Sequence, residues 1–250
     1  MSLNNPSQTA VSATRKTRSM DQAEKQAQEK KSEREKIAQA KNDEKERQKQ
    51  EKLKIAEQNK EMREVDKYTP DVLRKQYTSY RTNYMDTAET ITTTGLPIRH
   101  QNPPEDVTEN IAKFIIRNFH NDSSCKWAKA IGKKGDLFSK KYTDLQPPEV
   151  KSFISDGPSS FGPKKKFGAI YFLDMRNWLN DSFVLWHVNL TNESPAWKKL
   201  KMNKTQTNEE QCDEKRRPHI SWDKIYPQIS EHCTKVYEGT FEGIFTPPTL

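Results

Sequence analysis

The sequence predicts one α/β domain over residues 68–250, preceded by a charged extension over residues 1–67. Three observations support this fold class. Two nearly continuous apolar runs, at 167–175 and 182–190, are typical of buried strands. Between them and the extension, apolar residues recur at helical spacing over 107–119. The first 67 residues, in contrast, contain almost no core-forming side chains, so the composition changes sharply at that point.

The composition restricts the class of protein. Of 250 residues, 32% are hydrophobic and 31% are charged, and the formal net charge is +8. This charge favours a polyanionic partner, nucleic acid first and an acidic membrane surface second, although a basic protein without such a partner is the alternative. Three scattered cysteines without a CxxC pair argue against a disulfide framework and a structural zinc site.

The expected location is intracellular, in the cytoplasm or with viral or cellular DNA. No apolar run approaches the ~20 residues that a membrane span requires, so we expect no membrane-spanning segment, and we expect DNA rather than a membrane as the partner. The polar, Ser/Thr-rich stretch at 1–17 lacks the apolar centre of a secretory signal.

The extension is expected to be a solvated helix or a disordered segment. Residues 1–18 have the composition of a disordered tail, whereas 20–67 are rich in Glu, Lys, Gln, Arg and Ala, which favour helices. Its few apolar residues do not form a heptad seam, so a coiled coil is disfavoured. It could serve as a spacer or as a nonspecific nucleic-acid arm, but an inert extension is the simpler interpretation.

Two helices are expected next. Aromatic and apolar residues share one face of a helix within 66–84 and should pack it onto the domain: Leu73, Tyr77, Tyr80 and Tyr84. Residues 90–104 should form a loop. In the following helix, Asn102 fits the N-cap, Pro103 the first turn and Glu105 a capping box. Glu109, in the middle of this helix, has the simple interpretation of an exposed helix former.

A group of charged residues surrounds the first expected strand. If the strand begins at Glu149, then Glu149 and Lys151 project to the same face while Val150 enters the core. A hairpin through 138–148 would bring Asp136 beside Glu149. Two carboxylates and an ammonium can hold a hard divalent cation and position a water molecule. The alternative is a solvated edge strand with a surface salt bridge.

The remaining segments alternate between loops and regular elements. Turn residues at 155–163, followed by three lysines, indicate a surface loop. Asp174 and His187, on the two apolar strands, could form a second acid/base pair, but a histidine satisfied within its strand is favoured. A short helix is expected at 208–212, another after Ser221, and a closing strand over 235–245.

The expected order of elements is a helix, a hairpin that carries Asp136, a strand with Glu149 and Lys151, and further buried strands. In this order of elements, the chain resembles the PD-(D/E)XK nuclease superfamily, and within it type II restriction endonucleases. The resemblance covers roughly residues 90–190 and rests on Glu109, Asp136, Glu149 and Lys151. It implies that Asp136, Glu149 and the main-chain carbonyl of Val150 hold Mg²⁺, that Lys151 positions or activates the attacking water, and that Glu109 completes the metal environment. The chain departs from the family at Gly135, where a proline is frequent.

The resemblance implies a mixed sheet flanked by helices, as in restriction endonucleases, and Mg²⁺-dependent cleavage of double-stranded DNA at a specific short sequence by a homodimer. Basic and small polar residues outside the carboxylate group are candidate DNA contacts: Lys164, Lys165, Lys166, Lys204, Arg216, Arg217, Ser159 and Ser160. Three alternatives stay open: a non-catalytic nucleic-acid-binding protein, a structure-specific repair or junction nuclease, and an inactive relative with the same fold.

Overall fold

The computed structural model describes residues 33, 36, 39–54 and 65–247, and it divides the chain into two compact units, 1–62 and 63–250. In the first unit, residues 39–54 form a solvent-exposed helix with side-chain hydrogen bonds between positions four apart, such as Gln39 to Asp43. The expected tail at 1–18 lies outside the described residues. The division into domains at residue 67 stays a prediction.

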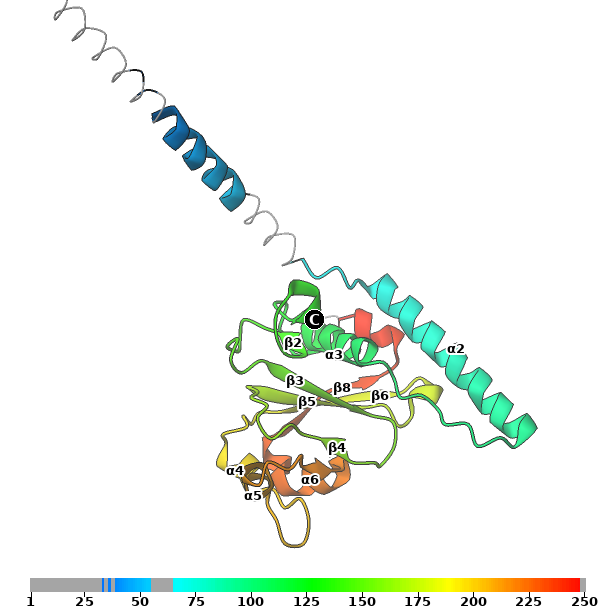
Figure 1. Ribbon diagram of the computed structural model, residues 1–250. Coiled ribbons are helices and arrows are strands. Elements are labelled where there is room, and N and C mark those ends of the chain that lie inside the picture. The colour runs from blue at the N-terminus through cyan, green and yellow to red at the C-terminus, as the bar shows by residue number, and fades with distance from the viewer. Residues whose placement is uncertain (1–32, 34–35, 37–38, 55–64, 248–250) are drawn as a thin grey trace, which may run out of the picture. The chain divides into compact units, whose positions relative to one another are not determined.

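The second unit is built on a four-stranded mixed sheet with the order β3-β5-β6-β8 (Figure 1). β3 and β5 are parallel, and the other two pairs are antiparallel. The helix α3 lies over one face, and α4, α5 and α6 lie over the other, so the predicted mixed sheet flanked by helices is confirmed. The strands of this sheet are β3 (Pro148–Phe153), β5 (Ala169–Asp174), β6 (Phe183–Val188) and β8 (Cys233–Gly239).

Short strands and helices complete this unit. β1 pairs with β2, and β4 pairs with β7, in two separate two-stranded ribbons. The bounds are α2 (Pro70–Thr94), α3 (Glu105–Phe119), β1 (Lys126–Trp127), β2 (Leu137–Phe138), β4 (Ser159–Ser160), α4 (Pro195–Lys198), α5 (Asn208–Asp213), β7 (His219–Ile220) and α6 (Trp222–Ile229). The 3-10 helices are η1 (Lys129–Ile131), η2 (Trp178–Asn180), η3 (Ser230–His232) and η4 (Glu242–Phe245).

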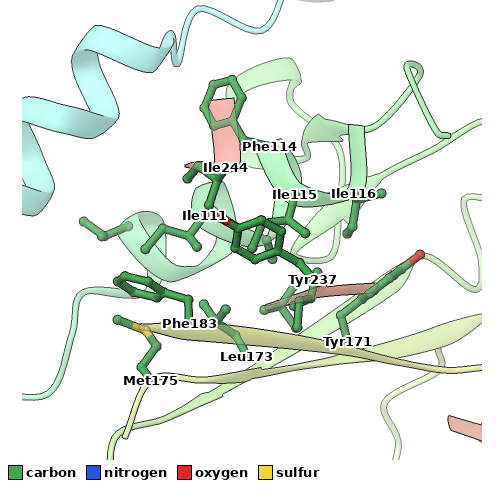
Figure 2. Packing of buried hydrophobic residues seen from close by; sticks show 14 of the residues in the cluster. Ile111, Phe114, Ile115, Ile116, Tyr171, Leu173, Met175, Phe183, Tyr237 and Ile244 are labelled. Atoms are coloured by element: carbon green, nitrogen blue, oxygen red, sulfur yellow. The ribbon is translucent and has the colours of Figure 1, made fainter. Parts of the chain in front are cut away.

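Alternation along β5 separates two hydrophobic cores. Tyr171 and Leu173 point to the face covered by α3, where Figure 2 shows them beneath Ile111 and Ile115. Ile170 and Phe172 of the same strand belong to the second core, under α4 and α6. Successive strand residues face opposite sides of a sheet, so the nearly continuous apolar run of β5 follows from its coverage on both faces.

The expected helix within 66–84 is confirmed, and its aromatic face packs on the core, but it continues to Thr94, into the segment expected to be a loop. Four threonine hydroxyls near its end each donate to the carbonyl four residues earlier, for example Thr94 Oγ1 to Thr90 O at 2.6 Å. The helix ends where Gly95 adopts φ +67°, a conformation that favours glycine.

The expected start of the next helix is wrong by a few residues. The N-cap of α3 is Pro104, without a side-chain cap, rather than Asn102. A residue that precedes a proline is disfavoured in the helical conformation, so Pro103 cannot begin the helix ahead of Pro104. The apolar stripe of this helix is buried, as predicted.

Several later expectations are confirmed. α5 and α6 form where they were predicted, but residues 242–245 of the expected closing strand form η4 instead. Asp174 and His187 do not form an acid/base pair, because Asp174 pairs with Arg176 at 2.6 Å while His187 lies opposite Tyr171 in the sheet. Within the part of the chain that the structure describes, no helix combines the length and apolarity needed to cross a bilayer.

Candidate active site

Two of the predicted site residues, Glu149 and Lys151, lie on β3, the edge strand next to β5. Val150 is buried in the core beneath α3, and its neighbours Glu149 and Lys151 project together from the opposite face, as the alternation predicts. Lys151 Nζ lies 2.7 Å from Glu149 Oε1. The Glu149 side chain is only 3% exposed, so this is a largely buried carboxylate rather than a solvated surface ion pair.

Asp136 lies beside β3, as expected, but the expected hairpin does not bring it there. The residues after Asp136 form β2, which pairs with β1 and not with β3, so the hairpin prediction is wrong. Asp136 nevertheless lies beside β3, because its Oδ2 accepts a hydrogen bond from the Val150 N–H at 2.9 Å. The aspartate therefore satisfies a main-chain donor on the open edge of the sheet.

Gly135 sets the backbone that presents Asp136. Its φ is +95°, a value that L side chains rarely adopt, and a Cβ there would lie 2.6 Å from Cγ of Pro147. A glycine is therefore required by both conformation and space. This accounts physically for the departure from the proline that is frequent in the resembling family, since proline fixes φ near −65°.

Lys165 joins the two carboxylates. Its Nζ lies 3.2 Å from Asp136 Oδ1 and also contacts Glu149 Oε2. From the sequence, this lysine is a candidate DNA contact, together with its exposed neighbours Lys164 and Lys166. No local pattern could have placed it here, because Lys165 and Asp136 are 29 positions apart and meet only through the tertiary fold.

Glu109 is buried, with 5% of the residue exposed, so its simple interpretation as an exposed helix former is wrong. Trp127 Nε1 donates to Glu109 Oε2 at 2.6 Å, and Lys129 Nζ donates to Oε1 at 3.3 Å. Burial raises the pKa of Glu109 to about 7; the Trp127 hydrogen bond opposes this and the charge of Asp136 adds to it. The role of Trp127 was missed; its position among lysines was the only signal.

A cleft of about 590 Å³ is lined by several of these residues. It brings together the carboxylates Glu109 and Asp136, the ammonium groups of Lys151 and Lys165, and four of the candidate DNA contacts. Those four are Ser159, Ser160, Lys165 and Arg217. The other four candidate DNA contacts are not among the described residues that line the cleft: Lys164, Lys166, Lys204 and Arg216.

The electrostatics of the pair Asp136 and Glu149 are those of two carboxylates held close together. Burial and the charge of Asp136 raise the pKa of Glu149, and Lys151 and Lys165 oppose the rise. Burial lowers the pKa of Lys165, but Glu149 and Asp136 outweigh it and leave the pKa above its ordinary value. Lys165 is therefore a charged counter-ion of both carboxylates.

The donor set fits a hard divalent cation. Asp136 Oδ1 and Glu149 Oε2 already share one ammonium, and Glu149 Oε1 is buried without a hydrogen-bond partner despite the nearby Lys151. Carboxylate and carbonyl oxygens are the ligands that Mg²⁺ prefers. In the described ranges there is no group of three or more His, Cys, Asp or Glu side chains arranged for a metal, and main-chain or water oxygens can fill the remaining positions around a Mg²⁺ ion.

Comparison with known proteins gives one finding. The family model described as Bsp6I restriction endonuclease matches residues 70–228, which is more than half of the chain and includes every residue of the cleft. No curated protein and no solved structure matches the chain.

Proposed function

The chain belongs to the Bsp6I restriction endonuclease family, and from this we propose that it cleaves double-stranded DNA at a specific short sequence in a Mg²⁺-dependent reaction. In this proposal, Asp136 and Glu149 hold the metal, Lys151 acts on the attacking water and Glu109 completes the metal environment.

One observation carries the assignment of the metal ligands. Oxygens of Asp136 and Glu149 converge on a single cationic group, the Lys165 ammonium, at the wall of an open cleft. The Val150 N–H points to Asp136 on the open edge of β3. Because the N–H and C=O of one strand residue point to the same side, the Val150 carbonyl faces that edge too and is suited to be the third ligand.

The chain's own residues supply the rest of the chemistry. A bound divalent cation polarises a phosphate oxygen and lowers the pKa of water. Lys151 is 22% exposed and lines the cleft, so its ammonium can orient a water molecule or stabilise the charge that develops on the phosphate. Glu149 holds Lys151 in that position through the 2.7 Å ion pair.

Substrate contacts follow the cleft. Arg217 and the β4 serines, Ser159 and Ser160, line it and are suited to contact phosphates or base edges. Four further basic residues are exposed but do not line the cleft, and they would serve the general attraction to the phosphate backbone: Lys164, Lys166, Lys204 and Arg216. A homodimer would match the two-fold symmetry of a palindromic site.

A digestion tests the proposal. Purified protein is incubated with unmethylated, phage-sized linear DNA in Mg²⁺ or in EDTA, beside the variants Asp136→Ala and Lys151→Ala. Lys224→Ala, which removes an exposed positive charge from α6, is the control for a lost lysine. We expect discrete fragments that require Mg²⁺, vanish in both site variants and persist in the control.

The other outcomes separate the alternatives. A Mg²⁺-dependent smear would keep the nuclease and remove sequence specificity, as for a structure-specific enzyme. Intact DNA in every lane, with tight binding that does not depend on metal or on Asp136, would leave a non-catalytic binding protein or an inactive relative. If discrete fragments appear, sedimentation of the protein with a short duplex containing the cleaved sequence tests the homodimer.

A further inference from the structure

Lys165 lies on a short turn that is anchored at both ends. Phe161 on one side and Phe167 on the other each pack edge-on against Trp197, with ring centroids 5.3 Å apart in both cases. Between these anchors, the Lys165 N–H donates to the Gly162 carbonyl at 3.0 Å and closes the turn. The backbone of Lys165 is thus fixed by the second core, while its side chain remains 39% exposed.

The two lysines of the site hold different oxygens. Lys151 pairs with Glu149 Oε1 and lies 5.7 Å from the centre of the Phe161 ring, so it is held by its own strand and by the core. Lys165 pairs with Glu149 Oε2 and Asp136 Oδ1. These are the two oxygens that converge on one position, and they are therefore the pair a divalent cation would need.

We propose that Lys165 is a resident counter-ion of the metal site: its ammonium neutralises Asp136 and Glu149 in the metal-free protein, and a divalent cation must displace it in order to bind. The displaced ammonium then lies free in the cleft, where DNA is expected. This inference rests on the metal ligands assigned under the proposed function.

The argument is one of competition for the same oxygens. Two carboxylates held this close repel each other unless a positive charge lies between them, and the ammonium of Lys165 provides it. A cation coordinated by Asp136 Oδ1 and Glu149 Oε2 cannot share them with the ammonium. Binding of the cation and the Lys165 ion pair are therefore negatively coupled, and such couplings commonly change affinity by about 5- to 150-fold.

The chain allows the exchange. Lysine carries its charge on a flexible four-carbon stem, and 39% of the Lys165 side chain already faces solvent. The ammonium can therefore move without a change in the anchored turn. Lys151, at 22% exposure, is the more confined of the two and keeps a contact with Glu149 that the exchange does not require it to break.

The first test uses the unmodified protein without DNA. Lysines are acetylated with an amine-reactive reagent in EDTA and in Mg²⁺, and the extent at each lysine is measured by mass spectrometry. We expect Lys165 to become several-fold more reactive in Mg²⁺, while Lys164 and Lys166, exposed on the same turn, do not change. Unchanged or reduced reactivity of Lys165 at saturating Mg²⁺ would overturn the proposal.

The second test measures Mg²⁺ and Mn²⁺ binding by calorimetry, again without DNA, for the parent, Lys165→Met and the control Lys224→Met. Lys165→Met should bind the metal about tenfold more tightly than the parent, and the control should not differ from it. Equal affinity for Lys165→Met and the parent, with binding abolished by Asp136→Asn, would overturn the counter-ion role and leave the metal site standing.

A third outcome would contradict the metal site itself rather than the role of Lys165 alone. If neither the parent nor Lys165→Met bound a divalent cation, the metal assignment of the proposed function would fail, and the inference with it. If Lys165→Met did not fold, the acetylation of the unmodified protein would decide the matter, because that measurement needs no variant.

Discussion

Glu109 gives a prediction that does not depend on catalysis. Its carboxyl is buried beside Trp127, and burial raises its pKa from an ordinary value of 4.5 to about 7. An acid whose pKa is higher in the folded state contributes stability below its unfolded pKa, and this contribution is lost as the pH rises through the folded value. The loss should therefore develop between about pH 4.5 and pH 7.

The size of the effect follows from the two pKa values. The interval from 4.5 to about 7 corresponds to about 3 kcal/mol of unfolding free energy, since each pH unit is worth about 1.4 kcal/mol. Glu109→Gln keeps an oxygen that can accept from Trp127 Nε1 but cannot ionise. We therefore expect the variant to gain about 3 kcal/mol relative to the parent between pH 4.5 and pH 8, with most of the gain below pH 7.

The assay is urea unfolding at a series of pH values in EDTA, with the parent, Glu109→Gln and the control Glu105→Gln. Glu105 lies on the same helix with 86% of its side chain exposed, and its variant controls for the loss of one negative charge. Burial also raises the pKa of Glu149, so the parent's own pH dependence contains more than one contribution and only the difference between parent and variant is diagnostic. A difference that stays constant from pH 4.5 to pH 8 would refute the reasoning.

Two further predictions concern Gly135 and the buried ion pair between Asp66 and Lys113. Gly135→Ala should lower the unfolding free energy by about 1–3 kcal/mol and reduce cleavage, because a Cβ at φ +95° meets Pro147 and displaces Asp136; unchanged unfolding and activity would contradict this. Asp66→Ala should cost about 3–5 kcal/mol, because the fully buried Lys113 ammonium loses the carboxylate 2.9 Å away. Adding Lys113→Met should restore part of that stability in urea unfolding, and a double variant as unstable as the single one would argue against an uncompensated buried charge.

The parts of the fold that the sequence predicted well are those encoded by neighbouring residues. The apolar stripe of α3 predicts that this helix is buried on one face, and the apolar run of β5 predicts a buried strand. The shared face of Glu149 and Lys151 follows from the pleat of a single strand. These patterns need no knowledge of which distant segment packs against them.

Two predictions are wrong because side-chain hydrogen bonds override the local preference for a loop or for a strand pairing. Threonines disfavour a helix interior, yet those near the end of α2 donate to carbonyls one turn earlier, and the helix continues to Thr94. Asp136 was expected to reach Glu149 through paired strands, but β2 pairs with β1, and the aspartate side chain itself bonds to the edge of β3. Both cases depend on side-chain hydrogen bonds that propensities do not include.

The second cation of the site shows the same limit with a consequence for function. The spacing of Glu149 and Lys151 brings one lysine to one carboxylate, and adding Asp136 gives two carboxylates for a single ammonium. The fold adds Lys165 from a turn anchored on Trp197, and this ammonium holds the oxygens that a metal would use. Two positive and two negative side chains then face one another, so a divalent cation gains attraction only by releasing a lysine. If that lysine is released into the cleft that Arg217 also lines, metal binding would add positive charge where a phosphate backbone is expected to lie. Under the two proposals, Lys151 and Lys165 would differ in role although both pair with Glu149: Lys151 would act on the attacking water, and Lys165 would couple metal binding to the charge of the cleft.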